Sequence, residues 1–108
     1  MIDWQRVAAL KEEVGAEDFD EVVELFLEEV DEVIDRLREC TDRDQLEADM
    51  HFLKGSAMNL GFECFSDLCQ MGEQMSANGQ AADVDVAAVL NCYDKSRAAF
   101  LGGMYQAA

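Results

Sequence analysis

The chain has 108 residues, with 24 acidic side chains against 8 basic ones and a formal net charge of −16. This length predicts one domain with one hydrophobic core, spanning residues 1–108. The charge argues against a nucleic-acid binder, because phosphate contacts need clustered Lys and Arg, and it disfavours docking on anionic membranes. Without a membrane-length apolar run or a signal-peptide pattern, the sequence predicts a cytoplasmic protein.

The absence of proline and an apolar spacing of three and four residues predict helices almost everywhere. A short helix is expected from about Asp3, its N-cap, to Val14, with Gly15 as its stop. A long amphipathic helix is expected from about 17 to 39. Its predicted buried stripe comprises Phe19, Val22, Val23, Phe26, Val30, Val33, Ile34 and Leu37.

Three further helices are expected, over about 42–61, 62–78 and 84–103, the last one fraying after Gly102-Gly103. Short connections favour an all-α fold, an antiparallel (up-down-up-down) four-helix bundle with the short N-terminal helix capping one end. Trp4, Val7 and Leu10 are expected to face inward from that cap. Because such a bundle can bury its own stripes, we expect a monomer.

The four cysteines show no metal-binding or disulfide pattern. No Cys-x-x-Cys pair occurs, and His51 is the single histidine, so the sequence predicts no metal site and no cofactor. Without a secretory signal a disulfide framework is not expected either. The cysteines are interpreted as reduced, small apolar residues within or near the core, at positions Cys40, Cys64, Cys69 and Cys92.

The third predicted helix carries a histidine away from its buried face. Its apolar stripe comprises Leu46, Met50, Leu53, Ala57 and Leu60. At about 100° per residue, His51 lies roughly 140° from the centre of that stripe, Lys54 about 80°, Met58 about 120° and Gly55 about 180°. His51 is therefore expected to point into solvent from the middle of a helix.

The residues around His51 suit the capture of a phosphoryl group. Imidazole is a nucleophile near neutral pH, and Lys54 could pair with a phosphoryl oxygen. Gly55 costs about 0.5–1 kcal/mol relative to alanine in a helix, which is explained if it leaves room for a partner. Ser56 could brace the helix by donating to the carbonyl of Phe52. Taken singly, each could also be an ordinary residue, with Lys54 paired to Glu47.

The chain lacks the remaining parts of a catalytic site. It contains no nucleophile-base-acid set, no phosphate-binding glycine loop and no metal-holding acidic motif around His51. We therefore expect another protein to complete the chemistry, and we expect the chain not to be an enzyme by itself.

The segment from His51 to Gly61, HFLKGSAMNLG, resembles the signature of histidine-containing phosphotransfer (HPt) domains, which is close to His-x-Leu-Lys-Gly-Ser-Ser/Ala-x-x-Leu-Gly. The resemblance implies that His51 accepts the phosphoryl group, that Lys54 helps to bind it and that Gly55 gives the partner room. It also implies that Ser56 supports the helix and that Gly61 forms the turn to the next one.

The resemblance further implies a phosphorelay that uses receiver domains of response regulators or hybrid kinases as partners. The phosphoryl group would pass from a receiver aspartate to His51 and then to an aspartate of a second receiver, with magnesium supplied by the receivers. The expected docking residues are Phe52, Met58 and Asn59, with Gln70 and Gln74 on the following helix. The acidic second helix is expected to serve solubility and partner rejection.

Two other classes of protein remain as alternatives. A non-catalytic helical adaptor would keep the acidic bundle and bind a signalling partner without using His51. An acyl or peptidyl carrier is also small, acidic and helical, but it needs an Asp-Ser-Leu motif, and this chain has Ser66-Asp67-Leu68 in the wrong order.

Overall fold

The computed structural model describes residues 2–39 and 43–106. These residues form α1 (Trp4–Val14), α2 (Phe19–Glu39), α3 (Leu46–Leu60), α4 (Glu63–Ala77) and α5 (Val86–Gln106), with a short 3-10 helix, η1 (Ala81–Asp83), before α5. No strand occurs among them, and a single antiparallel bridge joins Ile2 to Phe62. The prediction of an all-helical fold is confirmed.

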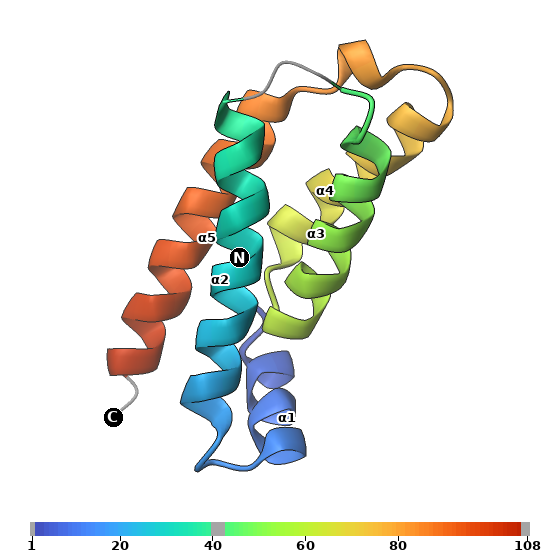
Figure 1. Cartoon of the computed structure of the whole chain (residues 1–108). Helices are drawn as coiled ribbons and strands as arrows, with labels where there is room; N and C mark the ends of the chain where they lie inside the picture. The colour runs from blue at the N-terminus through green and yellow to red at the C-terminus, as the bar shows by residue number, and fades with distance from the viewer. Residues whose placement is uncertain (1, 40–42, 107–108) are drawn as a thin grey trace.

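The helices form a bundle 44 Å long, with its other two extents 22 and 20 Å. Figure 1 shows α2 beside α5, and α3 beside α4, with α1 at the end of the molecule where α2 begins. The contact between α3 and α4 is the most extensive one between helices. In the described part of the chain, no helix is long and apolar enough to cross a membrane.

The predicted helix ends follow their local chemistry. The Asp3 side chain caps α1 by accepting hydrogen bonds from the backbone N–H groups of Gln5 and Arg6 at 3.1 and 3.2 Å. Gly15 ends α1 with a φ of 89°. Gly61 ends α3 in the left-handed conformation, with a φ of 76°, which glycine adopts without strain. The predicted start of the third helix, at about residue 42, was wrong: α3 begins at Leu46, and residues 43–45 precede it without helical structure, while Asp42 lies outside the described residues.

The predicted stripes are buried in α3 and partly buried in α2, where Val22, Phe26, Val33 and Leu37 are only half-buried. All five apolar residues of the predicted α3 stripe are buried, and Phe62, Phe65, Tyr93 and Phe100 form an aromatic cluster beneath them. In α2 the predicted stripe omitted Leu27, which is buried together with Val23 and Val30. Leu27 follows Val23 by four residues and precedes Val30 by three, so it belongs to the same face.

The predicted end of α5 was wrong. The helix continues through Gly102 and Gly103 to Gln106. Trp4 explains why a glycine is suitable there, because a Cβ added at Gly103 would overlap the indole ring, which also stacks on Phe100 with a centroid distance of 5.9 Å. Trp4 itself, predicted to face inward, is 43% exposed and covers the edge of the core. The 3-10 helix η1 was not predicted.

The cysteine prediction is confirmed in part. Cys69 is buried, Cys92 is half-buried, and all the cysteines of the described residues are free thiols. Cys64 is exposed, contrary to the expectation, because it lies in the first turn of α4 just before the buried Phe65, on a different face of the helix. Cys40 lies outside the described residues.

Candidate functional site

The site is built on the outer face of α3. The apolar residues Met50 and Leu53 are completely buried on the opposite face and fix the rotation of the helix. His51 therefore points outward, and its side chain is 71% exposed. The geometry agrees with the angular estimate from the sequence.

The side chain that holds His51 comes from α4. Glu73 Oε2 lies 2.6 Å from His51 Nδ1, and Glu73 Oε1 lies 2.6 Å from Lys54 Nζ. One carboxylate thus bridges the histidine and the lysine, and its own side chain is 21% exposed. The sequence reasoning missed Glu73 and expected any pairing of Lys54 to involve Glu47.

The position of Glu73 follows from the geometry of the α3–α4 hairpin. Both helices rise about 1.5 Å per residue away from the turn at Gly61 and Phe62, so residues equally distant from that turn lie opposite each other. Residues 51 and 73 are each eleven positions from Phe62. Close packing brings the helices together, because an added Cβ at Gly72 would lie 3.0 Å from the sulfur of Met50. The equal spacing of residues 51 and 73 from the turn is the sequence signal from which Glu73 could have been predicted.

The contact with Glu73 selects the tautomer of the neutral imidazole. The hydrogen bond from Lys54, and to a smaller extent the one from His51, holds the pKa of Glu73 below its ordinary value of 4.5. Glu73 is therefore a carboxylate at neutral pH. A carboxylate only accepts hydrogen bonds, and Nδ1 must therefore carry the proton and donate. In the neutral ring the lone pair then lies on Nε2, the nitrogen free of this contact.

The neighbours of His51 leave space for an incoming molecule. A Cβ added at Gly55 would meet no atom within 4 Å, apart from the helix's own backbone. Met58, seven residues after His51, is 60% exposed, and Phe52 is 37% exposed. Lys54 is the half-buried member of the group, because its amine is bound to Glu73.

The other predicted site residues lie elsewhere on α3 and α4. The side chain of Asn59 accepts a hydrogen bond from Arg6 Nη2 at 3.2 Å, which ties α3 to α1. Ser56 is buried on the inner side of α3. Gln70 and Gln74 are exposed on α4, on either side of Glu73 in the sequence.

Gly61 connects the site hairpin to the N-terminus. Its carbonyl accepts a hydrogen bond from the backbone N–H of Asp3 at 2.7 Å, and an added Cβ would approach the Asp3 carbonyl oxygen to 2.6 Å. Glycine is therefore required here for both its φ and its lack of a side chain. The predicted turn at this position is present.

The surface beside His51 is acidic. A hollow of about 580 Å³ is lined by Asp44, Glu47, His51 and Glu73, among others. Within residues 2–39 and 43–106, no group of three or more His, Cys, Asp and Glu side chains is arranged to hold a metal ion.

The fold and the site define an all-helical bundle that presents one histidine on its surface. The family model for the Hpt domain matches residues 21–99, and the chain belongs to this family. Hpt domains are phosphocarrier modules that perform histidine phosphotransfer in two-component signalling and interact with receiver domains. A search of curated proteins and a search of solved structures each gave no significant match.

Proposed function

We propose that His51 carries a phosphoryl group between the aspartates of two receiver domains, from a hybrid kinase to a response regulator. The observation that carries this proposal is the bridge from Glu73 to His51 and Lys54. It leaves Nε2 with its lone pair on an open, exposed face of the helix.

In the proposed transfer, Nε2 attacks the phosphorus of the receiver's aspartyl phosphate. The N–P bond forms as the P–O bond to the aspartate breaks, and the aspartate leaves as a carboxylate. Since Nδ1 keeps its proton, the phosphorylated ring carries a positive charge, which the Glu73 carboxylate neutralises. Transfer to the second receiver is the same step in reverse, and magnesium belongs to the receivers.

Lys54 is proposed to bind the phosphoryl oxygens. Its amine donates one hydrogen bond to Glu73 at 2.6 Å, and the two remaining N–H groups of the ammonium are the donors for the phosphoryl oxygens. The other predicted residues are given supporting roles. Gly55 allows close approach, Ser56 and Gly61 support the helix and its turn, and the docking surface comprises Phe52, Met58, Asn59, Gln70 and Gln74.

The proposal extends to the whole chain. We infer that residues 1–108 form a single domain that acts as a cytoplasmic monomer without a cofactor or bound metal of its own. We also infer that α2 to α5 form an antiparallel up-down-up-down bundle capped by α1. The reversal of chain direction between successive helices supports this arrangement (Figure 1).

Incubation with isotopically labelled phospho-receiver domains tests the proposal. The expected product is a phosphohistidine, labile in acid and stable in base, that is lost in His51→Gln. The helical content of the variant, measured by far-UV circular dichroism, should remain that of the native chain. Label on His51→Gln, or no label on the native chain from any receiver tested, would overturn the assignment.

A further inference from the structure

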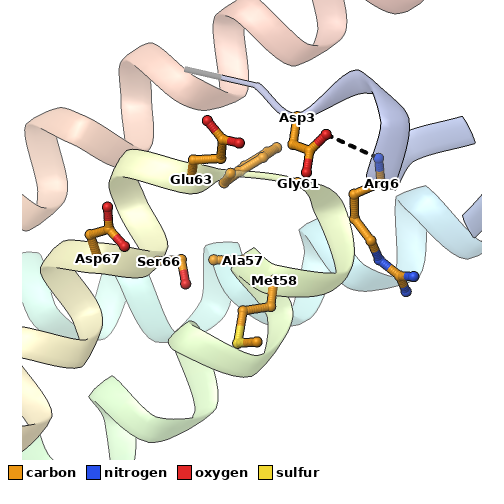
Figure 2. A pocket seen from close by; sticks show the side chains of 9 residues that line it. Asp3, Arg6, Ala57, Met58, Gly61, Glu63, Ser66 and Asp67 are labelled. Atoms are coloured by element: carbon orange, nitrogen blue, oxygen red, sulfur yellow. Dashed lines mark hydrogen bonds between the residues drawn. The ribbon is translucent and has the colours of Figure 1, made fainter. Parts of the chain in front are cut away.

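A second hollow lies further along the outer face of α3, between the start of α1 and the α3–α4 turn (Figure 2). Its volume is about 460 Å³. The buried Ala57 and the exposed Met58 supply apolar surface from α3, and Glu63 and Asp67 line it from the first turns of α4. We call this hollow the turn groove.

The turn groove contains two carboxylates that have neither an ion-pair nor a hydrogen-bond partner among the described residues. Glu63 and Asp67 are exposed and lie one helical turn apart, and neither side chain has an ion pair or hydrogen bond to the described residues. Arg6 also lines the groove, but its guanidinium is bound to Glu13 and Asn59 at 3.2 Å each. The Asp3 carboxylate is occupied in capping α1.

The turn groove lies within reach of a partner that covers His51. Met58 follows His51 by seven residues, which is about 10 Å along the helix axis, and both residues lie on its outer face. A standard protein interface buries about 800 Å² on each partner, equivalent to a disc of about 16 Å radius. A receiver domain centred near His51 therefore covers the groove as well.

We propose that the turn groove receives a lysine or arginine side chain of the receiver domain that docks over His51, an inference that rests on the proposed function. The aliphatic stem of that side chain packs on Met58 and Ala57, and its cationic head lies between Glu63 and Asp67. A receiver without a basic residue at this point would leave both carboxylates covered and unpaired. The groove thus selects among receivers.

The test is the double variant Glu63→Gln/Asp67→Asn, which removes both charges and keeps the side-chain shapes. Receiver domains are phosphorylated with acetyl phosphate, and the one that transfers fastest to the native chain is used. We expect the apparent KM for this receiver to rise about five-fold at low salt, with the maximal rate unchanged. The difference should shrink at high ionic strength.

The matched control is Glu24→Gln/Glu28→Gln, which removes the same charge from exposed residues one turn apart on α2. These residues share a face with Asp31, which pairs with Arg97 of α5, so they lie away from the α3 side. An unchanged KM in the groove variant, or an equal rise in the control, would overturn the groove proposal. Phosphoramidate, a small phosphoryl donor, should label His51 equally in all three proteins.

The two proposals fail in different ways. If neither phosphoramidate nor any phospho-receiver labels His51 of the native chain, the proposed function fails and the groove proposal fails with it. If transfer to His51 proceeds but the groove variant keeps the native KM, only the groove proposal fails. The charge-reversed variant Glu63→Lys/Asp67→Lys should raise KM further than the neutral one, and an effect no larger would contradict the proposed pairing.

Discussion

Asp31 and Glu73 are both carboxylates that join two helices, and they differ in the side chains that they bind. Asp31 of α2 accepts hydrogen bonds from Tyr93 and Arg97 of α5, and Tyr93 is a buried core residue. Glu73 of α4 accepts from Lys54 and from the exposed His51 of α3. The donors to Asp31 include a buried part of the core, whereas the donors to Glu73 are the two groups that we propose to engage a phosphoryl group. Under this proposal the same kind of contact stabilises the fold at Asp31 and orients the nucleophile at Glu73.

The largest effect on stability is expected from Asp31→Ala. Removing this carboxylate leaves the hydroxyl of Tyr93 without its acceptor, and we expect the free energy of unfolding to fall by about 2 kcal/mol. Urea denaturation measures this change. Phosphoryl transfer to His51 should stay at the native rate, and a slowed transfer would show that the two carboxylates are not separable in function.

Glu73→Gln should slow phosphoryl transfer and leave the stability of the fold nearly unchanged, the opposite of the result expected for Asp31→Ala. The amide cannot accept from both His51 and Lys54 as the carboxylate does, and it cannot neutralise the phosphorylated ring. We expect single-turnover transfer from a phospho-receiver to slow on the order of ten-fold, as when the partner that orients a functional histidine is replaced. The urea midpoint should change little. Glu28→Gln, which removes the same charge from an exposed glutamate of α2 away from α3, is a matched control, and it should leave the transfer rate at the native value.

Tyr93→Phe should remove the alkaline sensitivity of the Asp31 contact. Burial raises the pKa of Tyr93 above its ordinary value of 10.0, and the hydrogen bond to Asp31 adds to this increase. The folded protein therefore keeps Tyr93 neutral where the unfolded chain ionises, so stability is retained below that value and lost as the pH rises above it. At neutral pH the variant should lose about 1 kcal/mol. Urea titrations between pH 8 and pH 11 measure both effects, and an unchanged alkaline slope would contradict this account.

The smallest expected effect is the pH dependence of the stability difference between the native chain and Glu73→Gln. Because the folded pKa of Glu73 is depressed, its stabilising contribution is present above the ordinary carboxyl value of 4.5 and is lost as the pH falls through the folded pKa. The difference in stability between the native chain and Glu73→Gln should therefore disappear in this acid range. Urea titrations of both proteins from pH 7 down to pH 3 measure it. A difference that persists at the acid end would mean that the contact does not depend on the charge of Glu73.

The sequence predicted the outward face of α3, which carries His51, but it did not predict Glu73 on the neighbouring face of α4. The spacing of Met50, Leu53 and Ala57 is a property of α3 alone, so it fixed the outward direction of His51 without knowledge of the fold. Glu73 could be found only by placing α4 against α3 at the correct level, which depends on the position of the turn. On α4 the sequence analysis selected Gln70 and Gln74 as docking residues, whereas the residue of α4 that contacts His51 is the acceptor Glu73.

Packing between segments that are distant in the sequence explains the other differences between the predicted and the observed structure. The continuation of α5 depends on the contact of Gly103 with Trp4, which lies near the other end of the chain. Glycine spacing alone favoured an end to the helix at this point. The family signature supplied roles for His51 and Lys54, while the turn groove depends on the joint placement of α1, α3 and α4.

The position of Trp4 gives this protein a built-in optical probe. It is the only tryptophan in the chain, and its indole ring stacks on Phe100 and covers Gly103 at the end of the bundle where α1 packs. Its fluorescence emission therefore reports whether α1 remains attached to α5. Far-UV circular dichroism instead averages over all the helices. Comparing the two signals during unfolding would show whether the N-terminal helix separates before the rest of the bundle opens.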